Sequence, residues 1–317
     1  MSDRIPSFFM LVPGPWTSSA DVADVLTSAQ VEVAADEPIA GTVLVDVVED
    51  EHLAAAFAYG REGPLPDDLV EKVGRHRHAA LIECGWNLLE ATEKTAAIGQ
   101  ALCDAGGAAV RMEGSGNACD WEKWMRRMTS AHLDDLYANA VVIASDDDGT
   151  LFTCGMHQFG LPDAQLRLPR PDDAVVWLDA LCVFMLAEKP VLGSGHTFRP
   201  HDDVERRRLE RWPDHRHHLD DGRHNPFGLW RLVDDDDKAL QGMRDVPVIM
   251  PSLFALLQVM EQKKGAPLTA DEVDELVDNA PAVLMSQEDA NTLEASRGYA
   301  DLEPRRAWAQ WQLVREG

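Results

Sequence analysis

The sequence predicts an α+β protein that consists of a ferredoxin-like unit over residues 1–115, a second α/β unit over 116–233 and a helical module over 239–317. Its 317 residues suit about two domains of average size. Short apolar runs closed by Pro or Gly, which are typical of buried strands, alternate with segments whose apolar residues recur at helical spacing. The run DDDDK at 234–238 marks the last boundary, because like charges stay solvated.

In the N-terminal unit, the run SFFMLVPG (7–14) predicts a buried strand, and Ser18 or Ser19 caps the helix that follows. The runs 42–48 and 52–60 flank the acidic tripeptide EDE and predict a hairpin, although the alanines of the second run also suit a helix. The remaining elements are a helix over 66–74, a strand over 79–84, a helix over 88–102 and a strand over 108–113. The first six elements follow the order β-α-β-β-α-β, which is the ferredoxin-like order.

The second unit opens with a helix near 120–128. Its strands are predicted over 140–145, 151–159, 165–168 and 227–233. The segment 174–187 is apolar nearly all round, which predicts a deeply buried helix, and Asp172 or Asp173 is expected to cap it.

The C-terminal module carries the start and stop signals of four helices. Ser252 caps the first helix and Gly265 ends it. Thr269 and Glu272 form a capping box for the second. The last two helices are expected after Ser286 and after Pro304.

The formal net charge of −26 is the strongest bulk property of the chain. It argues against nucleic acids and anionic membranes as partners, because phosphate contacts require clustered Lys and Arg. No apolar run approaches the ~20 residues of a membrane span, and the N-terminal stretch predicts a strand and a turn instead of a signal peptide. Five cysteines without a CxxC pair predict free thiols in a reducing cytoplasm. The expected location is therefore the cytoplasm.

The charge is distributed unevenly. Residues 1–60 carry ten acids and one base, whereas residues 196–231 carry eight arginines against seven acids. Within this locally basic island, the stretch RWPDHRHHLDDGRH (211–224) holds four histidines and three aspartates. It is the candidate functional segment, and three interpretations of it stay open.

The first interpretation is a metal site. His215, His217 and His218 could supply imidazole ligands to zinc, manganese or iron, with Asp220 or a neighbouring aspartate supplying a carboxylate. Three protein ligands and a water would make a hydrolytic centre. Against it, the surrounding arginines repel a cation, and catalytic metals prefer ligands fixed on rigid elements.

The second interpretation is an interface, because Arg and aromatic residues are favoured at the energetic centres of protein interfaces. Its candidate residues are Arg211, Trp212, Arg216, Arg223, Phe227 and Trp230. Such a surface could dock on an acidic patch of a second copy, tie two domains of one chain together, or bind an acidic partner. The third interpretation is an irregular surface loop whose arginines pair with nearby carboxylates.

The signatures of common catalytic sites are absent from the sequence: GxxxxGK[ST], HExxH, GxSxG and zinc-type cysteine pairs do not occur. GSGN (114–117) lacks the lysine of a phosphate loop and predicts a turn. Cys84 ends a predicted strand, where a buried structural cysteine is the simpler interpretation.

Four phrases carry a resemblance to a known family: GPLP (63–66), VGRHRHAALIE (73–83), LFTCGMHQFGLPDAQLRL (151–168) and EKPVLGSGHTF (188–198). On these phrases, residues from about 8 to 233 resemble the bacterial family called domain of unknown function 4261, and the 151–168 phrase is the most specific. The helical module lies outside the resemblance. The family brings no activity and no catalytic residue. Such domains often occur among bacterial toxin–immunity and interaction proteins, so the resemblance implies partner binding.

Together these observations predict a non-enzymatic binding protein, of the immunity type, that uses an acidic surface against a basic protein partner. A strong negative field accelerates such an encounter, although charge that only maintains solubility is the alternative explanation. The competing hypothesis is a metal-dependent hydrolase built on the 196–224 loop. The first hypothesis needs no cofactor, and the second needs zinc, manganese or iron.

Overall fold

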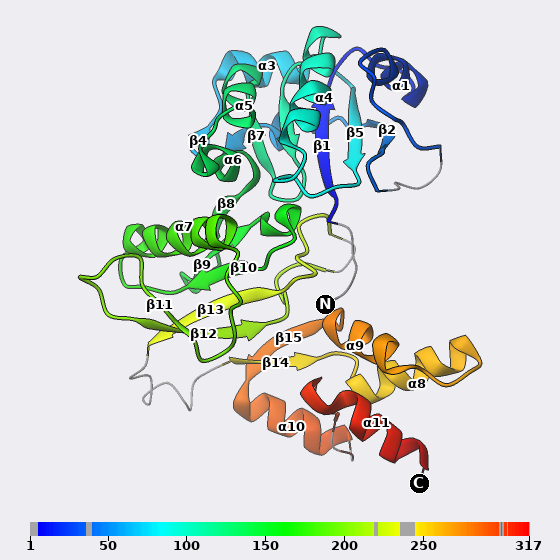
Figure 1. The fold of residues 1–317 in the computed structure, drawn as a ribbon, viewed down its shortest axis with the longest axis vertical. Helices are drawn as coiled ribbons and strands as arrows, with labels where there is room; N and C mark the ends of the chain where they lie inside the picture. Colours follow the sequence, from blue (N-terminus) through cyan, green and yellow to red (C-terminus); the bar gives the residue numbers. More distant parts are fainter. Residues whose placement is uncertain are drawn as a thin grey trace.

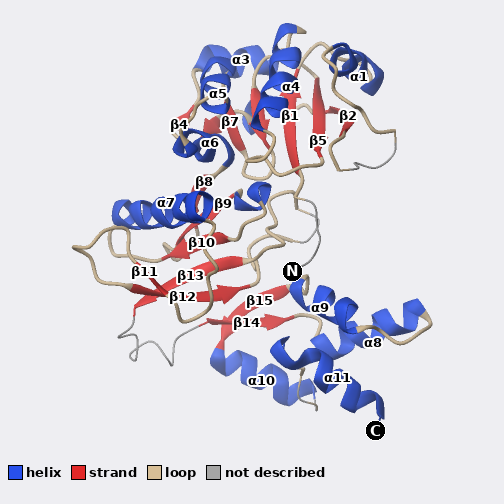
Figure 2. Cartoon of the chain, viewed as in Figure 1, coloured by secondary structure: helices blue, strands red, loops and turns tan. Residues whose placement is uncertain are grey.

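The computed structural model describes residues 6–35, 40–218, 221–234, 245–297, 299, 301–302 and 304–316. Helices and strands are mixed along the chain (Figures 1 and 2), which confirms the predicted α+β class. The described strands form sheets of five, six, two and two strands. None of the described helices combines the length and apolarity that a bilayer crossing requires.

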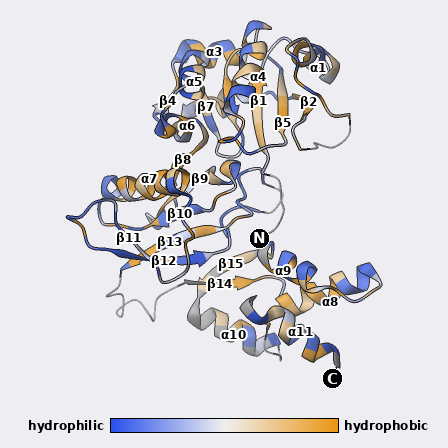
Figure 3. Cartoon of the chain, in the orientation of Figure 1, coloured by the Kyte–Doolittle hydropathy of each residue, from blue (hydrophilic) through white to orange (hydrophobic). Residues whose placement is uncertain are grey.

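Five strands form the N-terminal sheet in the order β2-β5-β1-β6-β7: β1 (Phe8–Pro13), β2 (Val43–Glu49), β5 (His78–Cys84), β6 (Val110–Met112) and β7 (Asn117–Cys119). Every neighbouring pair is antiparallel. Consequently β1 runs parallel to β2 with β5 between them, and β5 runs parallel to β6 with β1 between them. Two interleaved βαβ units of this kind are the ferredoxin-like arrangement. Among the three inner strands, β1 and β5 are largely apolar (Figure 3).

Helices α1 (Ser19–Ser28) and α4 (Thr92–Asp104) cover one face of this sheet. Their apolar side chains, among them Leu26 and Ile98, belong to the same buried cluster as alternate residues of β1 such as Met10. Ser18 caps α1 through a capping box with Asp21, as the sequence predicts.

The prediction that residues 52–60 form the second strand of a hairpin is wrong. Residues 53–56 form helix α2 (Leu53–Ala56), and only the short strands β3 (Tyr59–Gly60) and β4 (Gly63–Pro64) follow before helix α3 (Asp67–Gly74). The strand that pairs with β2 is β5 instead. The alanines favour the helix, and tertiary packing supplies the reason. The fully buried Leu53 and Phe57 cover the second face of the sheet, together with the partly buried Leu65 and Leu69 that follow in the chain.

Six strands form the second sheet in the order β11-β12-β13-β10-β9-β8: β8 (Val142–Ser145), β9 (Leu151–Cys154), β10 (Asp163–Leu166), β11 (Thr197–Phe198), β12 (Arg207–Trp212) and β13 (Leu229–Asp234). β10 and β13 are parallel, and the other neighbouring pairs are antiparallel. Helix α7 (Pro171–Glu188) lies along one face of this sheet (Figure 1). Its predicted burial holds for one side only, because Trp177 and Leu181 are buried whereas Val176 is 55% exposed. The expected Asp172 or Asp173 cap is wrong, because α7 begins at Pro171, whose ring fixes the first turn.

Helices α5 (Trp121–Met128) and α6 (Leu133–Ala140) connect the two sheets. Trp121 and Trp124 are buried and meet edge to face, with ring centroids 5.7 Å apart, so this helix packs its tryptophans into the core. One hydrophobic cluster extends from β1 through these helices to β13. The first sheet also continues past residue 115, since β7 pairs with β6.

The 151–168 phrase forms the joint between the two sheets. Its turn η1 (Met156–Phe159) follows Gly155, whose φ of 121° favours glycine. The Gln158 side chain donates to the Ala140 carbonyl at 2.7 Å, and the Gln158 carbonyl accepts the Leu88 backbone N–H at 3.0 Å. Asn87 donates to the Phe159 carbonyl at 2.8 Å. This buried turn thus ties the loop after β5 to the second sheet.

The C-terminal module contains the four predicted helices: α8 (Leu253–Lys264), α9 (Ala270–Asp278), α10 (Gln287–Arg297) and α11 (Ala307–Glu316). The caps at Ser252 and Thr269 and the left-handed stop at Gly265 are confirmed. An antiparallel strand pair, β14 (Asp245–Ile249) and β15 (Ala282–Ser286), was not predicted, because five-residue apolar runs carry too little periodicity to be assigned. The described part of the module has a hydrophobic cluster of its own. The predicted boundary at 234–238 lies almost entirely outside the described residues.

Candidate functional site

The buried carboxylate of Asp214 is the centre of the histidine-rich stretch. Its Oδ2 accepts the Asn225 backbone N–H at 2.9 Å, and its Oδ1 accepts the Arg216 backbone N–H at 3.0 Å. The Nδ1 atoms of His217 and His224 lie 3.4 and 3.7 Å from Oδ2. Burial alone would raise the pKa of Asp214, but the His217 contact, the Arg216 charge and the two backbone donors hold it well below its ordinary value. The ionised carboxylate of Asp214 is therefore the common partner of Arg216, His217, His224 and Asn225 in the loop between β12 and β13.

A second buried carboxylate, Asp163, anchors the same loop to the start of β10. Asn225 donates its side-chain amide to Asp163 Oδ2 at 2.6 Å, and Thr153 donates its hydroxyl to Oδ1 at 3.0 Å. Desolvation dominates here, so burial raises the pKa of Asp163 to about 6. Asn225 of the loop is thereby bonded to Asp163 of β10, which in turn is bonded to Thr153 of β9.

The predicted metal ligands do not converge. His217 faces Asp214, whereas His215 packs edge to face on Trp212 with ring centroids 5.9 Å apart, and burial lowers the pKa of His215 to about 4. His218 is exposed, and Asp220 lies outside the described residues. Within the described ranges, no three His, Cys, Asp or Glu side chains come together in a way that could hold a metal ion.

The buried His157 of the joint turn is an imidazole that the sequence reasoning missed. It comes from η1, and burial lowers its pKa to about 4. Its Nε2 and Cε1 atoms fill the space beside Gly114, where an added Cβ would come within 2.6 Å. A lone His in an apolar phrase gave no signal, because only the fold brings it to the loop.

The predicted interface residues are mostly engaged within the chain. The guanidinium of Arg211 lies 5.0 Å from the Trp230 ring centroid, and Trp230 itself is only 5% exposed. Arg216 lies 4.2 Å over the Phe152 ring, with its side chain 5% exposed. Trp212 and Phe227 are half-buried, and the half-exposed Arg223 pairs with Asp221 at 2.7 Å. The guanidinium of Arg231 lies 4.7 Å from the Trp212 ring centroid. These cross-strand cation–π pairs bind β12 to β13.

The cysteines offer no activated nucleophile. Cys84, Cys154 and Cys182 are buried free thiols, and burial raises the pKa of each well above its ordinary value. Because the thiolate is the nucleophile, these side chains are inert. The buried structural interpretation of Cys84 agrees with its place at the end of β5.

An acidic surface lies in the N-terminal unit, on and beside helix α1 and the end strand β2. We call it the acidic edge; its residues are Asp21, Asp24, Glu32, Asp46, Glu49, Asp50 and Glu51. All but Asp50, which is half-buried, are exposed. Ser19 of α1 donates to Asp46 of β2 at 3.3 Å, so the two elements lie side by side (Figure 1). Among the described residues, no Lys or Arg forms an ion pair with any of these seven carboxylates. The charge count of residues 1–60 signalled the acids, but only the fold gathers them.

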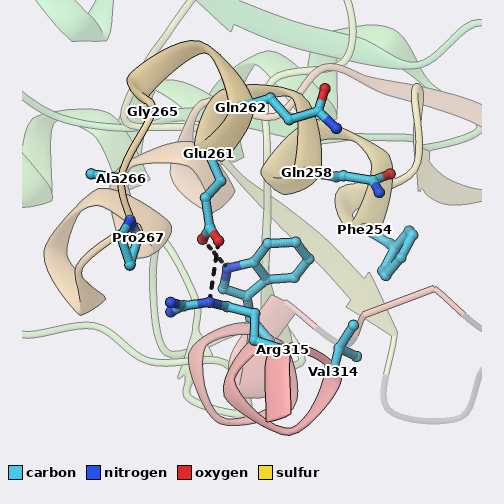
Figure 4. A pocket seen from close by; sticks show the side chains of 10 residues that line it. Phe254, Gln258, Glu261, Gln262, Gly265, Ala266, Pro267, Val314 and Arg315 are labelled. Atoms are coloured by element: carbon cyan, nitrogen blue, oxygen red, sulfur yellow. Dashed lines mark hydrogen bonds and ion pairs between the residues drawn. The ribbon is translucent and has the colours of Figure 1, made fainter. Parts of the chain in front are cut away.

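A pocket of about 480 Å³ lies between α8 and α11 of the C-terminal module (Figure 4). Phe254 and Trp311 supply aromatic surface, and Glu261 accepts Trp311 Nε1 at 3.1 Å and pairs with Arg315 Nε at 3.2 Å. The ion pair joins the two helices across the wall of the pocket. Its charges cancel, so the lining selects neither an anionic nor a cationic ligand.

Comparison with known proteins gives no relative: the chain matches no family model, no curated protein and no solved structure. The resemblance to domain of unknown function 4261 therefore stays a prediction that rests on its four phrases.

Proposed function

We propose that this chain is a non-enzymatic interaction protein whose acidic edge binds a basic protein partner. The observation that carries the proposal is the gathering of seven carboxylates, four on α1 and β2 and three in the loops beside them, with no Lys or Arg ion pair among the described residues. Unneutralised charge of one sign raises the rate of encounter with an oppositely charged partner and orients it.

Two further observations support the proposal. The arginines and histidines of the 211–224 stretch are largely used inside the chain, around Asp214 and across β12 and β13, so they do not offset the acidic edge. The family resemblance, which brings no activity, implies partner binding. The specific form that we propose is an immunity-type inhibitor that neutralises a basic toxin.

The test uses the full chain as bait in a lysate of its source organism, followed by mass spectrometry and by binding measurements with each purified candidate. We expect a basic protein whose Kd weakens at least about tenfold between low and high salt, since exposed charges separated by more than ~8–10 Å are screened at physiological ionic strength. An inhibitor should also abolish the toxicity of that partner in the purified complex.

A matched pair of variants separates the acidic edge from net charge. The triple variant Asp24→Asn, Glu49→Gln, Glu51→Gln removes three charges from the edge. The control Asp271→Asn, Asp274→Asn, Glu275→Gln removes three exposed charges from α9. We expect only the first triple to slow association with the partner. Equal effects of both triples, or binding that ignores salt, would contradict the proposal.

A further inference from the structure

The strand β2 is an end strand of its sheet, and its backbone polar groups alternate between two directions. Asp50 donates its backbone N–H to Arg77, and Thr42 accepts from Gly85, so the even-numbered residues bond to β5. The backbone N–H and C=O groups of the odd-numbered residues therefore point away from β5, to the open side of the sheet. Val43 shows this, because it donates to the Glu32 carbonyl and accepts from Ala34 on the outer side.

Beyond Val43 the outer side of β2 is open among the described residues. The outward positions are Val45, Val47 and Glu49, and neither Val45 nor Glu49 has a backbone hydrogen bond on this side from any described residue. The Val47 N–H is met by the carboxylate of its own neighbour, Asp46, at 2.8 Å. The short segment around Val33, which pairs in parallel with Val43, shows that the outer side accepts a strand.

The side chains along this open edge carry one sign of charge. Asp46 and Glu49 are exposed on β2 itself, and Glu51 follows it. Glu32 continues the same sign beside Val43. An extended segment added here would place its own side chains among these carboxylates, so charge complementarity selects Lys and Arg.

We propose that β2 recruits a basic extended segment of the partner protein as an additional strand. Main-chain hydrogen bonds to Val45 and Glu49 would supply affinity, and the acidic edge would supply selectivity for basic side chains. This inference rests on the proposed function and specifies how the partner is bound.

The experiment uses the full chain and a labelled peptide of ten residues that alternates Lys and Thr. We expect binding at low salt, measured by fluorescence anisotropy, and slower hydrogen exchange of the Val45 and Glu49 amides in the complex. An analogue with an N-methyl group on every residue keeps the charge but has no backbone N–H on either edge, and should bind at least about tenfold more weakly. A peptide that alternates Glu and Thr should not bind.

Two variants probe the protein side of the same ladder. Val45→Pro removes an outward N–H without touching the bonds to β5, a position at which an end strand tolerates proline. Val45→Thr is its control, because it keeps the N–H and the branched shape. We expect Val45→Pro to weaken peptide binding at least about tenfold and Val45→Thr to leave it near the wild-type value.

The outcomes separate the two proposals. Equal binding of the methylated peptide, or unprotected Val45 and Glu49 amides in the complex, would overturn strand addition and leave the acidic edge as a binding surface. No binding of the Lys–Thr peptide would also overturn strand addition. The proposed function fails only in the experiments with the captured partner.

Discussion

Two buried groups around the histidine-rich loop titrate in opposite senses, and their substitution should change the pH dependence of stability in opposite directions. Burial lowers the pKa of His157 from 6.5 to about 4, so its contribution to stability is complete above pH 6.5 and is lost as the pH falls toward 4. Burial raises the pKa of Asp163 from 3.8 to about 6, so its buried carboxylate opposes folding above pH 6, and that cost is relieved as the pH falls toward 3.8.

The size of each effect follows from the pKa shift of the group. One pKa unit between folded and unfolded states corresponds to about 1.4 kcal/mol. Between about pH 7 and about pH 5, the His157 pKa implies a loss of about 2 kcal/mol, and the Asp163 pKa implies a gain of about 1 kcal/mol. Both pH values lie above the isoelectric point of about 4.6, which keeps the protein charged in the assay.

The perturbations are His157→Gln and Asp163→Asn, which replace each titrating group by a neutral side chain. His157→Gln should lose about 2 kcal/mol less than the wild type between about pH 7 and about pH 5, and Asp163→Asn should lose about 1 kcal/mol more. The readout is the change between the two pH values, because either substitution can also shift stability at every pH.

The measurement is native-state hydrogen exchange at the slowest amides of β13, which reports on the second sheet separately from the C-terminal module. Any other group that titrates equally in all three proteins, such as His215, cancels in the comparison. If the three proteins change stability in parallel between the two pH values, the assignment of these pKa shifts to burial is wrong.

Three further predictions test the fold and the alternative function. Gly155→Ala should destabilise the chain by about 2 kcal/mol or more, because its φ is 121° and an added Cβ would lie 2.3 Å from the Ala140 carbonyl; Gly149→Ala, also at positive φ but with open space around it, should cost about 1 kcal/mol in urea unfolding. Arg61→Ala should lower the free energy of unfolding by about 3 kcal/mol, because the largely buried Arg61 donates two hydrogen bonds to Asp179 at 2.8 and 2.9 Å. Loss of an exposed surface ion pair would lower it by under about 1 kcal/mol. Elemental mass spectrometry of protein purified without chelator should find far less than one equivalent of zinc, manganese or iron, because no three described His, Cys, Asp or Glu side chains are arranged to hold a metal ion. Near one equivalent that is lost on His217→Ala would restore the hydrolase hypothesis.

Features that depend only on residues a few positions apart were predicted correctly from the sequence. Ser18 with Asp21 and Thr269 with Glu272 form the expected capping boxes, and Gly265 ends α8 in the left-handed conformation. Such caps satisfy backbone groups of their own helix, so no distant residue is needed to decide them. The buried strands β1 and β5 were equally clear, because continuous apolar runs are favourable only inside a sheet.

Elements that depend on distant partners were not predictable in the same way. The strand β12 reads RRLERW, and only Leu209 in it is fully buried, so its pattern gives no strand signal. Its partners lie on other elements: Arg207 contacts Trp177 and Asp234, and Arg211 contacts Trp230. Residues 53–56 form a helix because this places Leu53 and Phe57 against the second face of the first sheet.

The candidate site divides along the same line. By itself the sequence determined the charge balance, the absence of common catalytic motifs, the helix caps and the apolar strands, since each is a property of composition or of near neighbours. Only the tertiary structure decided that Arg216, His217 and His224 gather around the buried Asp214, and that the seven carboxylates of the acidic edge gather beside an open strand edge. Whether a charge is neutralised depends on which side chains lie within a few ångströms of it, and that distance is set by the packing of elements far apart in the chain.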